Sequence, residues 1–145
     1  MRAGDDLRAL VALTAAKRDR ETAQLREIQA EEARLRAALA RLDAQAAEAR
    51  VLPEAAIAGL REIGADLSWQ GWVARQRAAL NAELSLVLAR REKALPPLRL
   101  AFGKAEAAEM LAARQLGLVR VRTTEREARA LEELGLMARA RDQTS

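Results

Sequence analysis

The fold of this chain is decided by residues 68–141, which read SWQGWVARQRAALNAELSLVLARREKALPPLRLAFGKAEAAEMLAARQLGLVRVRTTEREARALEELGLMARAR. Apolar residues recur here at the three- and four-residue spacing of a helix that packs along one side. The only prolines in the stretch are Pro96 and Pro97. Helices in globular proteins average only about three to four turns. A helix of this length therefore needs a second long helix alongside it.

Residues 5–50 are the candidate for that second helix. Neither Gly nor Pro occurs between Asp5 and Arg50, and Asp5 fits an N-cap. Three charged residues interrupt the seam, and they either set register, contact the opposite helix or mark where the seam is uncovered. The predicted seam positions are Leu7, Val11, Thr14, Arg18, Glu21, Leu25, Ile28, Glu32, Leu35, Leu39, Leu42, Ala46 and Ala49.

A connector of about residues 51–67 separates the two helices. Pro53 fits the first position of a short helix, because its missing N–H has no helical partner there. Gly64 fits the residue that stops that helix in a left-handed conformation. Asp66 or Ser68 would then cap the second long helix.

The second helix has its own predicted seam, interrupted by the prolines. Pro96-Pro97 removes two backbone donors, so we expect a sharp kink or a one-turn break. A reversal of the chain into a three- or four-helix bundle is the alternative, although no turn-forming residue flanks the prolines. The apolar seam thins between Arg120 and Arg129. The predicted seam positions are Val73, Gln76, Leu80, Leu84 and Val87 before the prolines, and Ala101, Lys104, Ala108, Leu111, Gln115 and Leu118 after them.

The predicted fold is all-α, with two long helices in an antiparallel coiled-coil hairpin. It has a short connector helix, and the second long helix is kinked at Pro96-Pro97. We expect one coiled-coil domain over residues 1–145, with helices at about 5–50 and 68–141. Composition agrees, since 50% of the residues are hydrophobic and only 2% aromatic. An Ala- and Leu-rich chain of this kind is typical of long helices rather than of a broad core.

Composition also argues against an enzyme. The chain has no Cys and no His, which removes thiol nucleophiles, imidazole bases and the usual zinc ligands. It has no Gly-rich phosphate loop either. We therefore expect no catalytic residue, cofactor, metal or small-molecule substrate. No apolar run approaches the roughly 20 residues that span a bilayer, and no signal-peptide pattern begins the chain, so we expect a cytoplasmic protein.

The positive charge is concentrated in the second helix. The chain holds 25 Lys and Arg against 21 Asp and Glu, a net charge of +4. Arginines toward the C-terminal end form either a solvated helix face or an electrostatic docking surface. Interleaved Glu and the small net charge argue against a nucleic-acid partner. The basic residues between Leu84 and Arg122 are Arg90, Arg91, Lys93, Arg99, Lys104, Arg114, Arg120 and Arg122, against Glu92, Glu106 and Glu109.

The two tryptophans open the second helix on one face. Trp69 and Trp72 are three residues apart, so their side chains lie together. They either close the end of the hairpin against Ile57, Leu60 and Ile63, or form an exposed anchor for another protein.

The chain resembles the flagellar export protein FliJ and its injectisome counterparts of the YscO type, which are central stalk proteins of type III secretion. The resemblance rests on Trp69-Gln70-Gly71-Trp72, on the basic run Arg90-Arg91-Glu92-Lys93, and on the charged end Glu125-Arg126-Glu127. Residues 104–115, the chain length and the longer second helix are also similar. Pro96-Pro97 departs from the uninterrupted helix expected of the family.

The resemblance implies a stalk that enters the hexameric export ATPase, activates it, and links it to the cytoplasmic domain of the export-gate membrane protein at the base of the secretion apparatus. Export chaperones are further partners that it implies. The sequence leaves open a structural coiled-coil scaffold that pairs with itself or with another helical protein. The residues implied in ATPase binding are Arg8, Lys17, Arg18, Arg120, Arg122, Arg126 and Arg129. The residues implied in gate binding are Leu39, Leu42, Trp69, Trp72, Gln76 and Leu80.

Overall fold

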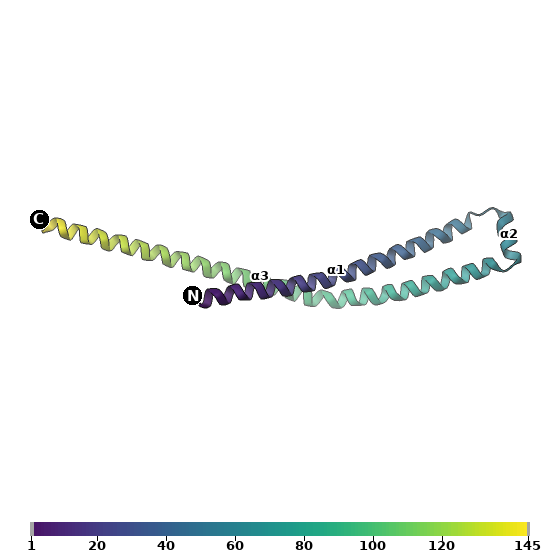
Figure 1. Ribbon diagram of the computed structural model, residues 1–145, viewed down its shortest axis with the longest axis horizontal. Helices are drawn as coiled ribbons and strands as arrows, with labels where there is room; N and C mark the ends of the chain where they lie inside the picture. The colour runs from purple at the N-terminus through teal and green to yellow at the C-terminus, as the bar shows by residue number, and fades with distance from the viewer. Residues whose placement is uncertain (1, 145) are drawn as a thin grey trace. The chain divides into compact units, whose positions relative to one another are not determined.

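A computed structural model describes residues 2–144, with the side chain of Leu60 left out. The chain forms three helices in this range and no strand. They are α1 (Arg2–Arg50), α2 (Glu54–Glu62) and α3 (Ala65–Gln143), labelled in Figure 1. The all-helical class is confirmed, as is the presence of two long helices that pack against each other.

The ends of the long helices differ from the predicted ones. Helix α1 begins at Arg2, so Asp5 lies in its first turn instead of capping it. Helix α3 begins at Ala65, so the predicted caps Asp66 and Ser68 are already helical. Both aspartates still lie close to the positive end of a helix, where a carboxylate is stabilising.

Pro53 and Gly64 set the two ends of the connector helix α2. The carbonyl of Pro53 accepts the N–H groups of Ala56 and Ile57 at 2.9 and 3.1 Å, so Pro53 is the N-cap of α2 rather than its first helical residue. Gly64 ends α2 at a φ of 71°, a left-handed conformation that glycine adopts without strain. The prediction that Gly64 stops the short helix is confirmed.

The two prolines do not break α3. Pro96 and Pro97 lie inside the helix, so the predicted one-turn break is absent and there is no turn for a reversal of the chain. Each proline removes a backbone hydrogen bond, at a cost of about 3 kcal/mol in a helix interior. Both are exposed, which leaves the freed carbonyls open to water, while Leu95 and Leu98 beside them are half-buried. Side-chain packing on the flanks therefore holds the helix together.

The chain divides into two compact units, and the boundary crosses both long helices. The larger unit is Asp19–Arg99. Its parts of α1 and α3 lie side by side and are joined through α2 (Figure 1). Asp43 pairs with Arg77 and Glu31 pairs with Arg90 across the contact, so the two helices run in opposite directions. That the chain is a single domain stays a prediction.

The core of this unit is a narrow seam. Ile28, Leu35 and Val87 are buried together, and Leu80, Leu84 and Ala94 pack against them. Every seam position predicted on α1 is buried or half-buried, so that seam is confirmed. On α3, Gln76 is exposed and its neighbour Arg77 is half-buried instead. The buried or half-buried positions on α3 that alternate by three and four residues are 73, 77, 80, 84, 87, 91, 94 and 98.

The second unit contains the residues up to Arg18 and those from Leu100 onward. Its buried residues are Thr14 on α1 and Ala101, Ala105 and Ala108 on α3. Alanines let two helix backbones approach closely, because they fill little space between them.

This alanine contact corrects the predicted seam after the prolines. Lys104, Leu111 and Leu118 are exposed, while Ala105 and Ala112 take the packed positions. The buried or half-buried positions continue the same spacing at 101, 105, 108, 112 and 115. From Leu116 to Thr144, every described residue is exposed.

Removing a seam residue should destabilise the helix pair. Leu35 is 8% exposed, and Leu35→Ala deletes apolar contacts that the opposite helix cannot refill. We expect a loss of about 2 kcal/mol in the free energy of unfolding, measured by urea titration of the helical circular dichroism signal. Leu86 is 68% exposed, so Leu86→Ala is the matched control and should change stability by less than about 0.5 kcal/mol. Equal losses in both variants would refute the seam.

The alanine contact can be tested with larger side chains. Ala105 is 1% exposed, so Ala105→Leu should force the helices apart and cost roughly 1–3 kcal/mol. Ala107 is exposed on another side of the same helix turn, and Ala107→Leu should leave the melting temperature nearly unchanged. A stabilised Ala105→Leu variant would contradict the close approach of the two helices.

Candidate functional site

The basic residues predicted near the C-terminal end lie on a stretch of α3 that we call the C-terminal arm, residues 116–143. Arg120, Arg122, Arg126 and Arg129 are all exposed there. Among the residues that the structure describes, none of the four takes part in an ion pair. Thr123 and Thr124 donate their hydroxyls to the carbonyls four residues earlier, both at 2.9 Å, so the helix satisfies these groups itself. The four guanidinium groups are free to meet another molecule.

Three of these arginines occupy seam positions. The packed positions of α3 end at 112 and 115, and the same spacing continues at 119, 122, 126 and 129. Only the first of these four is apolar. A helix could not bury Arg122, Arg126 and Arg129 without also burying unpaired charges, which is costly. The packing stops close to the level at which α1 begins, because Arg18 lies 3.6 Å from Glu109 and only residues 2–17 of α1 precede Arg18.

The predicted basic residues on α1 divide into two kinds. Arg8 and Lys17 are exposed, and Arg8 is 3.8 Å from Asp5 of its own helix. Arg18 is half-buried: its guanidinium lies 3.6 Å from the Glu109 carboxylate and 5.8 Å from the centre of the Phe102 ring. Arg18 thus helps to hold its own unit together, while Arg8 and Lys17 remain accessible.

The residues predicted near the connector also divide. Leu42 is buried, and Leu39 and Leu80 are half-buried in the seam, where another protein cannot reach them directly. Trp69 and Trp72 are 37% and 40% exposed, and Gln76 is exposed too. Of the residues predicted to bind the gate, the two tryptophans and Gln76 are therefore accessible, and the three leucines are packed in the seam.

The tryptophans form a stacked pair. Their ring centres are 5.3 Å apart and their planes differ by 18°, a favourable offset for aromatic rings. Trp69 shares the lining of a groove with Ile57, but Ile63 is 76% exposed, and the side chain of Leu60 lies outside the described residues. The pair is accessible to a partner, as an exposed anchor requires.

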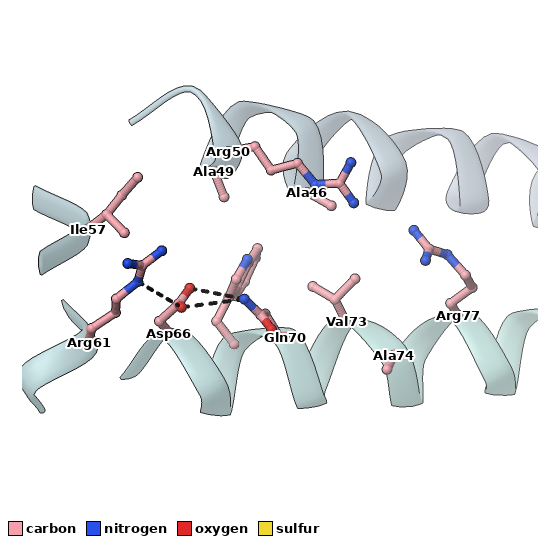
Figure 2. A pocket seen from close by; sticks show the side chains of 11 residues that line it. Ala46, Ala49, Arg50, Ile57, Arg61, Asp66, Gln70, Val73, Ala74 and Arg77 are labelled. Carbon is pink, nitrogen blue, oxygen red and sulfur yellow. Dashed lines mark hydrogen bonds and ion pairs between the residues drawn. The ribbon is translucent and has the colours of Figure 1, made fainter. Parts of the chain in front are cut away.

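A groove opens where α1 ends and α3 begins (Figure 2). It has a volume of about 500 Å³, and an adjoining apolar hollow of about 320 Å³ shares Ala49, Ile57, Asp66 and Trp69 with it. Sequence reasoning missed this groove, although the small seam residues Ala46 and Ala49 are a signal for it. Its lining residues are Ala46, Ala49, Arg50, Ile57, Arg61, Asp66, Trp69, Gln70, Val73, Ala74 and Arg77.

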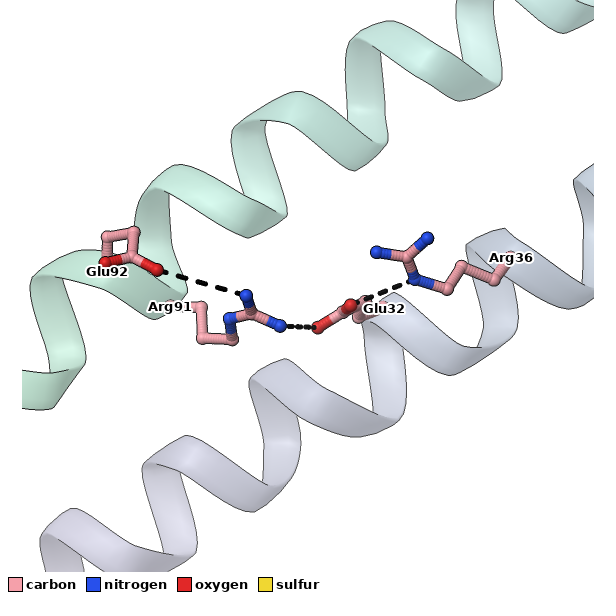
Figure 3. Close-up of polar contacts among 4 residues, drawn as sticks. All are labelled: Glu32, Arg36, Arg91 and Glu92. Carbon is pink, nitrogen blue, oxygen red and sulfur yellow. Dashed lines mark hydrogen bonds and ion pairs between the residues drawn. The ribbon is translucent and has the colours of Figure 1, made fainter.

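A chain of ion pairs joins α1 to α3 in the middle of the larger unit (Figure 3). Glu32 accepts a hydrogen bond from Arg36 at 2.9 Å on its own helix and another from Arg91 at 2.9 Å across the seam. Arg91 also lies 3.9 Å from Glu92. Of the readings open for the charged seam residues, Glu32 therefore fits a contact to the opposite helix.

These contacts shift the titration of Glu32. The hydrogen bond from Arg36, and then the charge of Arg91, hold the pKa of Glu32 below its usual range, and partial burial opposes them. The side chain is 12% exposed and belongs to the packing of the two helices. We assign this cluster to stability and not to chemistry.

Acid should weaken this contact. The pKa of Glu32 is lower in the folded chain than in the unfolded chain, so its stabilising effect is complete above the unfolded pKa and is lost as the pH falls through the folded pKa. We expect Glu32→Gln to lower the melting temperature at neutral pH, with a difference from the unsubstituted chain that shrinks in acid. Circular dichroism melts across the acidic range measure this. Glu27→Gln, at an exposed position of α1, is the control, and a Glu32→Gln difference that is constant with pH would contradict the assignment.

The structure adds two general findings for residues 2–144. No helix there has an apolar stretch long enough to cross a membrane. No group of three or more acidic side chains is placed so that it could hold a metal ion in that range. Comparison of the chain with protein-family models, curated proteins and solved structures finds no match.

Proposed function

We propose that this chain is a non-enzymatic stalk or adaptor of a type III protein export apparatus, flagellar or injectisome, that binds and activates the hexameric export ATPase and links it to the export gate. The observation that carries the proposal is the C-terminal arm. It is helical, each of its described residues is exposed, and its arginines have no ion-pair partner among the described residues. A helix of this kind is suited to dock on another protein.

The proposal includes the finer fold, an antiparallel coiled-coil hairpin. Its support is the unbroken alternation of three and four residues between packed positions on both long helices. That spacing is the pattern of knobs-into-holes packing in a coiled coil. A slim, stiff body of this kind suits a stalk, because it is stable without a broad core.

Arginines of the arm, together with Arg8 and Lys17, form the proposed ATPase-binding surface. Exposed guanidinium groups attract acidic loops and speed association, while screening by salt keeps each contact exchangeable. Such contacts suit a stalk whose partner changes shape in each catalytic cycle. Arg18 contributes by holding the Glu109 and Phe102 side chains of its unit in place.

At the connector end, we assign the gate contact to Trp69, Trp72 and Gln76, which are accessible. Leu39, Leu42 and Leu80 support this surface from the seam behind it. Stacked, half-exposed tryptophans are the side chains that most often dominate protein interfaces. Export chaperones are further proposed partners, and the proposed location is the cytoplasmic base of the apparatus.

A scaffold that pairs with itself or with another helical protein is the second candidate. It is favoured by the exposed apolar residues Leu131, Leu134, Leu136 and Met137, which are 60–70% exposed. Analytical ultracentrifugation separates the two candidates. An elongated monomer supports the stalk, and a stable dimer that dissociates on Leu131→Gln and Leu134→Gln substitution supports the scaffold.

The stalk proposal is tested with the export ATPase of the same organism. The purified chain should raise the ATP hydrolysis rate of that hexamer. Reversing the charge with Arg120→Glu, Arg122→Glu and Arg126→Glu together should reduce the stimulation at least several-fold, since like charges would then face acidic loops. Helicity should stay the same because every described residue of the arm is exposed.

The matched control reverses three exposed arginines of the larger unit, with Arg34→Glu, Arg41→Glu and Arg75→Glu. This variant has the same net charge as the arm variant and should still stimulate the ATPase. Equal stimulation by both variants would show that the arm is not the ATPase-binding surface.

A further inference from the structure

The groove at the connector end exists because the seam ends in small residues. Ala46 and Ala49 are the last seam positions of α1, and Val73 is the buried residue nearest the start of α3. Two alanines do not fill the space that opens as the two helices separate toward α2 (Figure 1). The resulting groove of about 500 Å³ has an apolar floor of Ala46, Ala49, Ile57 and Val73.

The rim of the groove is positively charged. Arg50 lies on the α1 side, while Arg61 and Arg77 point toward α1 from the opposite side (Figure 2). Asp66 is the one carboxylate in the lining, so three guanidinium groups stand against one acidic group.

Two of these arginines already have partners. Arg61 lies 3.9 Å from Asp66, and Arg77 pairs with Asp43. Arg50 has no ion pair with any residue that the structure describes. An incoming carboxylate therefore meets one arginine whose charge is uncompensated, next to the apolar floor.

The groove also carries an aromatic wall. Trp69 lines both the groove and the adjoining apolar hollow, and it is 37% exposed. Trp72 stacks on it, with 5.3 Å between the ring centres. A rigid, half-exposed aromatic ring beside an unpaired arginine is a favourable anchor for a side chain that is partly apolar and partly acidic.

We infer that this groove binds a peptide segment of a partner protein in which a large apolar side chain stands next to an acidic one. The apolar side chain lies on Ala46, Ala49 and Trp69, and the acidic one pairs with Arg50. A cavity of about 150 Å³ holds one benzene-sized group, so this groove has room for more than one apolar side chain. Arg61 is 72% exposed, which leaves the groove open along its side, as a peptide needs and a small enclosed ligand does not.

This inference adds a binding chemistry to the gate contact of the proposed function. It rests on the proposed function only for the identity of the protein that supplies the segment. The binding chemistry stands on the groove itself. It is therefore tested on the purified full-length chain, without ATPase or gate protein.

The probes are short synthetic peptides in which Leu alternates with Glu, Gln or Lys. Isothermal titration calorimetry measures binding to the unsubstituted chain. In a Trp72→Phe variant, Trp69 is the only tryptophan, so its emission reports whether the peptide reaches the groove. We expect the Glu peptide to bind and to shift this emission, with weaker binding at higher salt. The Gln and Lys peptides should bind at least tenfold more weakly.

Two variants test the site. Arg50→Gln removes the uncompensated charge and should weaken binding of the Glu peptide about tenfold, while Arg41→Gln, an exposed arginine of α1 outside the groove, should not change it. Ala49→Leu fills the groove, so it should abolish binding and leave the melting temperature equal or higher.

Three results would overturn the inference. They are unchanged affinity in both Arg50→Gln and Ala49→Leu, equal affinity for the Glu and Gln peptides, and a shift of the Trp69 emission by ATP but not by the Glu peptide, which would mark a nucleotide site. If the Glu peptide binds but the chain does not stimulate the ATPase, the groove is supported as a peptide site and the proposed function is refuted.

Discussion

The contact between α1 and α3 is the constraint on which everything else in this molecule depends. Two helices have only one face each to bury, so the positions that recur every three and four residues carry nearly all the packing. Val87, Ala105 and Ala108 are the most deeply buried apolar residues described, at 1–2% exposure, and two of them are alanines. Small side chains hold the helices close together but give little tolerance for change. A substitution in this seam therefore changes the packing against the opposite helix.

The seam fails in two different ways, and each failure leaves an accessible surface. Near the connector, Ala46 and Ala49 occupy the expected seam positions, but their side chains are too small to fill the space between the helices. A groove therefore remains there. After Gln115, α3 continues past the level at which α1 begins, and its seam positions become Arg122 and Arg126. The first failure produces a concave surface with an apolar floor. The second produces an exposed helix with three arginines, Arg122, Arg126 and Arg129, along one face. In our proposals, the first surface binds a peptide segment and the second binds an acidic loop.

The sequence predicts most of this fold because periodicity and turn chemistry are local. The α1 seam and the stop at Gly64 follow from residue spacing alone, and both are confirmed. After the prolines, the predicted seam positions Ala101, Ala108 and Gln115 are confirmed, but Lys104, Leu111 and Leu118 were wrong. Hydrophobicity favoured Leu111 and Leu118, whereas the close approach of the two backbones selects Ala105 and Ala112. Of the structures predicted at Pro96-Pro97, the one-turn break and the reversal were wrong for a related reason, since packing of the flanks outweighs a local preference, while the kink stays a prediction. The exposure of the tryptophans and the groove beside them depend on how the helices separate, which no local pattern encodes.

The arginines of the arm also bear on which partner it can have. If two copies paired through the continued seam, Arg122, Arg126 and Arg129 of one chain would approach the same residues of the other. Like charges in a desolvated contact are strongly unfavourable, so this face disfavours self-pairing, which agrees with the acidic partner that we propose. The apolar residues Leu131 and Leu134 lie outside the continued seam, which passes through Glu133 and Leu136. Self-association through Leu131 and Leu134 would thus use a different face from the one that packs in the rest of the molecule. Leu131 and Leu134 therefore lie on a different face from the three arginines, whereas Leu136 continues the arginine face, so a partner that neutralises the arginines leaves, of these three leucines, only Leu131 and Leu134 free.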